Sequence, residues 1–128
     1  MYLCVQNVYV MENVVALKSY KFALKVISLY KVLTFEQKEF VLSKQLLRSG
    51  TAVGALVKEA EHAQSKPDFL NKMNVALKEI NETEYWLMLL KDSFIISEKD
   101  FDYIYSDCVE LIKILASIVK TAKTSLQK

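Results

Sequence analysis

Four side chains have the types and spacing of a metal centre. Glu59 and His62 form a Glu-x-x-His motif, which places two metal ligands on one face of a helix. Glu79 and Glu82 could add carboxylates from the next segment. A ferritin-like di-metal site, however, needs this motif on two helices and a glutamate on each of two others. Only one such motif is present, and Glu110 has no accompanying histidine, so we interpret His62 as a surface residue and predict no metal.

The sequence gives little support for nucleophilic catalysis or for a phosphate-binding loop. Cys108 would need a base, and the one histidine, His62, is expected near the opposite end of the fold. Gly50 and Gly54 lie inside a helical pattern rather than after a strand, which excludes a phosphate loop. Their spacing suits the close approach of a neighbouring helix, with a groove or hinge as the alternative. Cys4 and Cys108 are too few for a disulfide framework. The sequence predicts neither catalytic activity nor a cofactor.

Lysines gather in two parts of the chain, although the formal net charge is only +2. Residues 12–34 carry a net +3 and residues 111–128 a net +4, whereas residues 97–110 carry −4. If the first and last segments lie side by side, their lysines could contact phosphate backbones of RNA. The alternative is that acids early and lysines late in the last helix complement its macrodipole. The candidate contact residues are Lys18, Lys21, Lys25, Lys113, Lys120 and Lys123.

The composition favours a single all-α domain that positions these residues. Of 128 residues, 52% are apolar, and two glycines and one proline are too few for the turns of a many-stranded sandwich or barrel. We interpret residues 1–11 as an N-terminal extension and residues 12–128 as the domain. The opening segment lacks signal-peptide features, and no stretch approaches the ~20 uncharged apolar residues of a membrane span. We therefore predict a cytoplasmic protein that does not bind membranes.

Helix start signals and hydrophobic periodicity define four helices. Ser65 with Asp68, and Ser97 with Asp100, have the spacing of capping boxes. Short connections between long helices predict an antiparallel up-down-up-down four-helix bundle. The predicted helices cover residues 13–33, 36–64, 65–94 and 97–124. The first helix has two adjoining apolar rows, one with Ala16, Tyr20, Ala23, Ile27 and Tyr30, the other with Phe22, Val26, Leu29 and Leu33.

The chain has more apolar residues than one bundle needs. About 43% of the positions of a bundle helix face its core, against 52% apolar residues here. The run at residues 85–90 covers every side of the third helix, so one core cannot bury it. We predict a homo-oligomer whose interface is formed by the third helix, including Tyr85, Trp86 and Leu89, and by parts of the first or fourth helix. The alternative is that scattered apolar surface residues are normal in monomers.

Four charged residues on the second and third helices could form an ion-pair network. Arg48, Glu59, Glu79 and Glu82 are expected to fix the register of these helices if they are buried together. The alternative is four solvated charges that contribute little individually. Arg48 is the only arginine, which argues against base-specific recognition of nucleic acid.

The second and third helices also carry a family resemblance. Residues 46–55, LLRSGTAVGA, followed by Glu59, resemble the helix-two signature of the bacterial 23S rRNA-intervening-sequence proteins. Ala52 and Leu56 depart from it, because the family usually has serine and asparagine there. The match covers about residues 12–123. Similar matches on the first and third helices are Lys18-Ser19-Tyr20, Phe22-Ala23, Asp68-Phe69, Ala76-Leu77-Lys78-Glu79, Glu82-Thr83 and Tyr85-Trp86-Leu87.

The resemblance implies a four-helix bundle that assembles as a ring, typically a pentamer, without enzymatic activity or cofactor. Family members are often encoded within large-subunit rRNA genes, which suggests RNA or a ribonucleoprotein as partner. The leading hypothesis is therefore an oligomeric binding module that contacts RNA through lysines. The alternative is a protein–protein scaffold without a nucleic-acid role.

Overall fold

The computed structural model describes the backbone of residues 2–127 and the side chains of residues 13–127. This part of the chain contains helices and no strand, which confirms the predicted all-α class. None of its helices is long and apolar enough to cross a membrane. The four helices are α1 (Tyr2–Phe35), α2 (Leu42–Ala60), α3 (Lys66–Asp92) and α4 (Glu98–Gln127).

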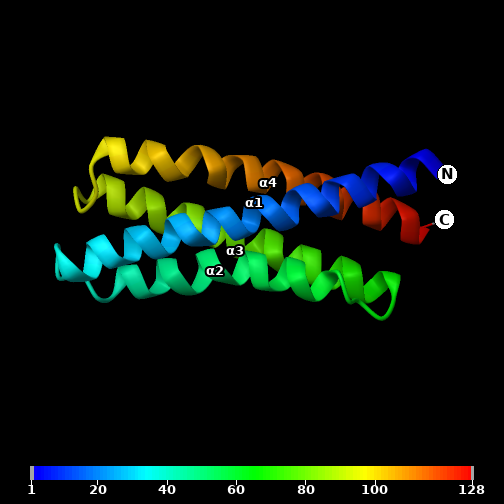
Figure 1. Cartoon of the computed structure of the whole chain (residues 1–128), viewed down its shortest axis with the longest axis horizontal. Coiled ribbons are helices and arrows are strands. Elements are labelled where there is room, and N and C mark those ends of the chain that lie inside the picture. Colours follow the sequence, from blue (N-terminus) through cyan, green and yellow to red (C-terminus); the bar gives the residue numbers. More distant parts are fainter. Residues whose placement is uncertain (1, 128) are drawn as a thin grey trace.

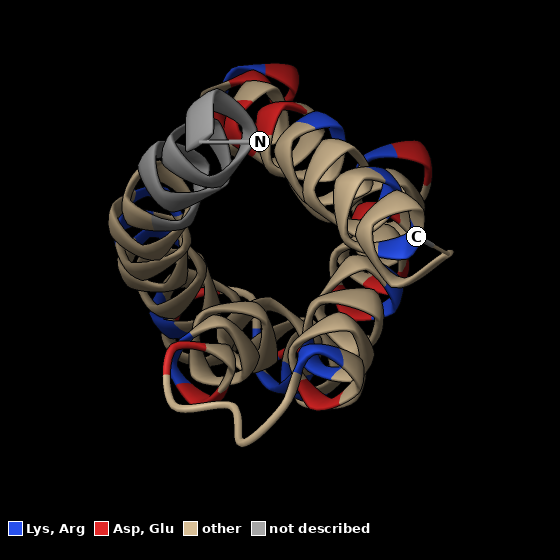
Figure 2. Ribbon diagram, turned by 90° about the vertical axis from the view of Figure 1, so that its right-hand side faces the viewer, with Lys and Arg blue, Asp and Glu red and all other residues tan. Residues whose placement is uncertain are grey.

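The helices form an elongated four-helix bundle (Figure 1). The chain runs along α1 to one end of the molecule, back along α2, out again along α3 and back along α4. Seen end-on, the helices surround a common axis (Figure 2). α1 packs against α2 and α4, and α3 packs against the same two helices, so α1 and α3 lie diagonally across the bundle.

The first two predicted helices differ from the observed ones in their bounds. α1 begins at Tyr2 rather than near residue 13. The side chains of residues 1–12, including Cys4, lie outside the described part, so the division at residue 11 stays a prediction. α2 ends at Ala60 rather than near residue 64.

The start of α2 was predicted wrongly, because residues 36–41 form a turn and an irregular segment instead of helix. Lys38 has a φ of 55°, a left-handed conformation that ends the preceding helix. The Glu39 carboxylate then accepts backbone hydrogen bonds from Val41 (3.2 Å), Leu42 (2.9 Å) and Ser43 (2.7 Å). Since these N–H groups have no partner within the helix, Glu39 caps α2.

The opposing effects on Glu39 leave its carboxyl more acidic than usual. Burial raises its pKa. Hydrogen bonds from the backbone of Leu42, Ser43 and Val41, and from the Ser43 side chain, lower the pKa, and together they outweigh the effect of burial. The net pKa lies below the ordinary glutamate value. The cap therefore works best when Glu39 is ionised.

The two predicted capping serines are confirmed. The Ser65 hydroxyl accepts a hydrogen bond from the Asp68 N–H at 3.2 Å, and the Ser97 hydroxyl accepts one from the Asp100 N–H at 3.1 Å. The Asp68 carboxylate in turn accepts from the N–H of Gln64 (3.2 Å). These short-range bonds start α3 and α4 close to where their sequences predict.

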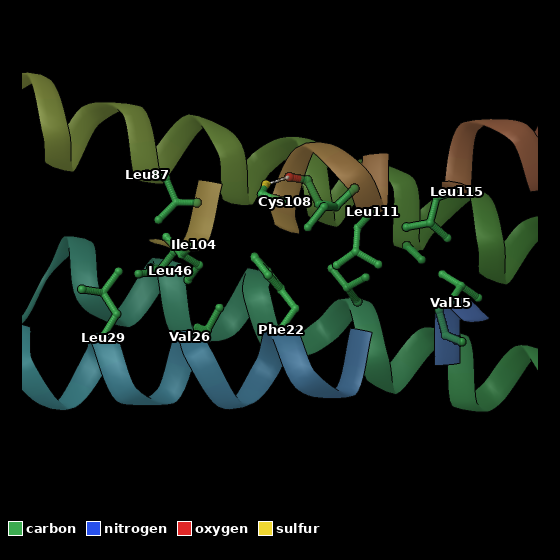
Figure 3. Close-up of a cluster of buried hydrophobic side chains, with 14 of the residues drawn as sticks. Val15, Phe22, Val26, Leu29, Leu46, Leu87, Ile104, Cys108, Leu111 and Leu115 are labelled. Carbon is green, nitrogen blue, oxygen red and sulfur yellow. Dashed lines mark hydrogen bonds between the residues drawn. The ribbon is translucent and has the colours of Figure 1, made fainter. Parts of the chain in front are cut away.

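The core lies along the axis of the bundle, and all four helices contribute to it (Figure 3). Of the two apolar rows on α1, the one with Phe22 and Val26 is buried, whereas Tyr20 of the other row is 64% exposed. Leu46 of α2, Leu87 of α3 and Ile104, Cys108, Leu111 and Leu115 of α4 fill the same interior.

α1 and α2 approach closely at the two glycines of α2, as their spacing predicts. A Cβ atom at Gly50 would lie only 2.8 Å from a methyl carbon of the buried Val26. A Cβ atom at Gly54 would lie 3.4 Å from the backbone oxygen of Ser19, which is an ordinary contact distance. Gly50 thus sets the separation of the two helices more strictly than Gly54 does.

Candidate assembly and RNA-contact surfaces

The Glu-x-x-His motif does not assemble a metal centre in the described part of the chain. Glu59 and His62 are both exposed, and the nearest cation to Glu59 is the Lys72 ammonium, 3.7 Å away. No three His, Cys, Asp or Glu side chains within residues 13–127 converge as a metal site would require. Glu79 and Glu82 bind Arg48 instead.

Cys108 is a buried thiol in the core between α3 and α4. Its S–H group donates to the carbonyl oxygen of Ile80 across 3.8 Å. Burial, and to a smaller extent the Glu84 carboxylate, raises the pKa of Cys108 to about 12. Because the thiolate is the nucleophilic form, this side chain is unreactive at neutral pH.

Glu84 also links α3 to α4 through Tyr105. The Tyr105 hydroxyl donates to the Glu84 carboxylate at 3.0 Å. This hydrogen bond, with smaller effects of burial and nearby negative charge, raises the pKa of Tyr105. The pair was not predicted from the sequence, since neither residue belongs to a recognisable motif.

Three of the four residues predicted to form a polar network come together between α2 and α3. The Arg48 guanidinium contacts Glu79 at 3.0 Å and also contacts Glu82. Glu82 accepts a further hydrogen bond from the Trp86 indole N–H at 3.1 Å. The prediction that Glu59 joins this network was wrong, because it lies eleven residues after Arg48, about 16 Å along the helix axis.

The polar pair that is buried between α2 and α3 is a different one, and it begins one residue after Arg48. The Arg48 side chain is half-exposed, whereas the hydroxyls of Ser49 and Thr83 are fully buried and hydrogen-bonded at 2.8 Å. The Thr83 hydroxyl accepts from Ser49 and donates its own hydrogen to the Glu79 carbonyl (2.8 Å) in its own helix. Both residues occupy core-facing positions of the apolar pattern, which is the only signal that could have revealed the pair.

An apolar strip lies on the outer side of α1. Leu17, Tyr20 and Leu24 point away from the core and are at least half exposed. Beside them, small side chains of α1 and α2 line a shallow apolar groove. Its lining includes Ala16, Ala23, Thr51, Gly54 and Ala55, with Lys58 and Glu61 at one end.

The residues predicted for an oligomer interface on α3 differ in exposure. Tyr85 is 56% exposed and its neighbour Met88 is also exposed. Leu89 is only partly exposed. Trp86 is partly buried against the core, and its ring contacts the Tyr85 ring edge-on, with centroids 5.1 Å apart. The exposed large apolar side chains of α3 are thus Tyr85 and Met88.

Two of the six candidate RNA-contact lysines are neutralised by acids of α4. Lys18 pairs with Glu110 at 2.8 Å, and Lys25 pairs with Asp107 at 2.5 Å. Lys25 also donates to the Tyr103 carbonyl at 3.1 Å and lies over the Tyr103 ring. These lysines hold α1 against α4 and are poorly placed to bind phosphate.

The other four candidate lysines are exposed. Lys21 lies on α1, whereas Lys113, Lys120 and Lys123 lie along the second half of α4. Their spacing of seven and three residues places the α4 lysines on one side of the helix. Residues 111–127 contain no acid, and the nearest acid of α4, Glu110, pairs with Lys18 of α1.

Comparison with known proteins agrees with the helix-two and helix-three motifs. The sequence model of the 23S rRNA-intervening sequence protein family matches residues 11–117. The chain belongs to this family. No curated protein sequence matches the chain.

A solved structure of high similarity comes from Bacteroides thetaiotaomicron VPI-5482. It is the 1.70 Å crystal structure of a protein of unknown function from the S23 ribosomal protein family. The two sequences are 55% identical, the match covers 86% of this chain and 98% of that chain, and the TM-score is 0.84.

Proposed function

We propose that this intervening-sequence protein is a non-enzymatic, homo-oligomeric binding module in the cytoplasm. The observation that carries the proposal is the exposed strip of Leu17, Tyr20 and Leu24 beside a groove of small residues. Soluble monomers rarely leave large contiguous apolar patches in water. A neighbouring copy that covers the strip would remove this apolar surface from solvent.

The α3 face of a neighbouring copy is the proposed occupant of the groove. Tyr85 and Met88 lie on α3, diagonally opposite to α1, so one copy could use its α1 face and the next its α3 face. Contacts between two different faces generate a ring when the rotation closes. The resemblance to the family favours a ring of five copies.

Light scattering on the purified protein tests the assembly. Leu17→Glu combined with Leu24→Glu is expected to convert the oligomer into folded monomers, since two charges would be buried where the neighbouring copy covers the strip. Ser106→Glu combined with Ser117→Glu, two exposed positions on α4, is the matched control and should leave the oligomer intact. A wild-type protein that is monomeric with a native helical spectrum would contradict the proposal.

We further propose that the oligomer contacts RNA or a ribonucleoprotein through the α4 lysines. The support is the acid-free stripe of Lys113, Lys120 and Lys123, together with the rRNA link in the family name. Electrostatic contacts of this kind bind phosphate backbones without reading base sequence. Lys21 could extend the surface onto α1.

Filter binding to structured 23S rRNA fragments tests the RNA contact. The wild type should bind at ~50 mM salt, and replacing the three α4 lysines by glutamine should lower the log–log salt slope by about 2–3. The matched control replaces Lys44, Lys78 and Lys99, which are exposed elsewhere and remove the same charge. Equal loss in both triple variants would show unspecific attraction and overturn the assignment to α4.

The second candidate is a protein–protein scaffold without a nucleic-acid role. The ion pairs of Lys18 and Lys25 support this candidate, because they remove two lysines from the proposed RNA surface. Copurification from the native host, with and without nuclease, separates the two. Partners that stay bound after nuclease treatment, with no RNA recovered, would favour the scaffold.

A further inference from the structure

Both connections that join helices at one end of the bundle expose apolar side chains. The connection between α1 and α2 and the connection between α3 and α4 lie at this end (Figure 1). The exposed residues are Phe35, Phe40, Val41 and Phe94, and the Phe94 side chain is 93% exposed. Gln37 from the first connection and Phe94 from the second line the same hollow, so the two connections adjoin.

Phe94 occupies a position that does not suit its side chain. Its φ of 62° is in the left-handed region just after α3, where glycine is the usual residue. The backbone there is held by bonds from the Phe94 N–H to Lys91 and from the Ile95 and Ile96 N–H groups to Leu90, at 3.0–3.2 Å. The buried Ile96 anchors the connection, so the phenyl ring projects from a fixed base and contributes no burial to the fold.

Asp92 is a second residue that does not stabilise its own helix. It is the last residue of α3, where a negative charge opposes the helix macrodipole. Asp92, Phe94 and Glu98 line the same hollow, together with Gln37 and Ile95. Local choices that conflict with fold stability are concentrated at binding sites. We call this set of five residues the loop-end site.

The surroundings of the loop-end site are acidic. Residues 35–41 and 91–102 hold six carboxylates and three lysines, a formal charge of −3, and one of these lysines, Lys91, itself lines the hollow. Glu39 caps α2, while the other five carboxylates form no ion pair with any residue in the described part of the chain. Two of them, Glu98 and Asp100, also complement the dipole of α4. The remaining three are Glu36, Asp92 and Asp102.

Exposed aromatic rings beside unpaired carboxylates are suited to binding lysine or arginine. The same protein uses this combination internally, where Lys25 lies 4.0 Å from the centre of the Tyr103 ring and pairs with Asp107. Lys91 similarly lies over the Phe101 ring. We propose that the loop-end site binds a basic peptide segment of another protein, whose lysine or arginine side chains flank an apolar anchor.

Fluorescence anisotropy with a defined peptide tests this proposal. The probe is a short fluorescein-labelled peptide that alternates lysine with leucine or phenylalanine. One control peptide has glutamate in place of lysine, and another has alanine in place of the apolar residues. Only the first peptide should bind well, and its affinity should fall as salt is added.

Phe94→Gly is the decisive variant, because glycine relieves the left-handed strain and the fold should not suffer. It is expected to weaken binding about tenfold, the equivalent of ~1.4 kcal/mol, with an unchanged or higher melting temperature. Asp92→Asn should weaken binding in the same direction. Leu126→Ala, at an exposed apolar position near the other end of the bundle, is the matched control and should bind as the wild type does.

Two results would overturn the proposal. One is a Phe94→Gly variant that binds the probe as tightly as the wild type. The other is a Phe94→Gly variant whose oligomer is smaller than that of the wild type by light scattering, because a second copy would then cover this end. Neither result depends on the α1 strip or on the α4 lysines. The inference can therefore be refuted without refuting the proposed function, and the reverse also holds.

Discussion

The two sides of α2 are packed in different ways. Towards α1 the contact depends on small residues, since Gly50 lies against Val26 with no room for another carbon atom. Towards α3 the contact depends on polar pairs. Arg48 binds Glu79 at the surface, and Ser49 is hydrogen-bonded to Thr83 in the core. The first contact sets how close two helices come, and the second sets how far one is shifted along the other. Distance and register are thus controlled by different residues of one helix.

The largest effect is expected where α1 and α2 are closest. Gly50→Ala should destabilise the protein by about 1–2 kcal/mol, because overpacking against Val26 outweighs the helix propensity gained with alanine. Gly54→Ala is the matched control and should be neutral or up to ~1 kcal/mol more stable. Urea unfolding measures both. Equal stability of the two variants would break the comparison, since neither glycine would then set the helix separation.

The buried hydroxyl pair should give the next largest effect. Thr83→Val leaves the Ser49 hydroxyl without its partner across the helices and should cost about 1 kcal/mol. The double variant with Ser49→Ala removes both groups and should recover most of that loss. Unfolding of the two single variants and the double variant gives the coupling directly. Additive losses would mean that the pair does not specify the register.

A smaller loss of stability is expected when the surface ion pairs of Arg48 are removed. Arg48→Met should cost no more than about 1 kcal/mol, because the guanidinium is half-exposed and solvent screens it. The loss should shrink at high salt. Lys44→Met, also exposed on α2, serves as control and should change nothing. A salt-independent loss at Arg48 would indicate packing of its stem rather than charge.

The smallest effect concerns the start of α2. Since the folded pKa of Glu39 is lowered, its carboxylate stabilises the fold at neutral pH, and this contribution is lost as the pH falls through the lowered pKa. Glu39→Gln should therefore cost about 0.5–1 kcal/mol above the ordinary glutamate pKa of ~4.3 and progressively less below it. Unfolding free energies at several pH values measure this. A pH-independent difference would contradict the capping role.

Local signals were sufficient for much of the fold. Ser65 and Ser97 start α3 and α4 because a capping hydroxyl needs only the next turn of its own helix. The burial of Cys108 follows from helical periodicity in the same way. The start of α2 was missed because Glu39 competes with helix through a side-chain bond that no periodic pattern records.

The candidate surfaces were harder to predict, because they depend on how the helices are rotated. Both apolar rows of α1 suit a core, and only packing decides that Phe22 points inward and Tyr20 outward. Lys18 and Lys25 were predicted to meet RNA, yet acids of α4 face them. No sequence pattern marks Phe94 as unusual, since its backbone conformation and exposure are properties of the folded chain.

The sequence by itself determined that this protein is built of helices, roughly where they lie, and which family it resembles. Helix formation depends on neighbours one turn away, which the sequence displays directly. Only the tertiary structure decided which charges pair and which apolar face stays open, because those outcomes depend on residues brought together from distant parts of the chain. Glu59 illustrates this, since its partner became Lys72 rather than Arg48 once α2 and α3 had packed.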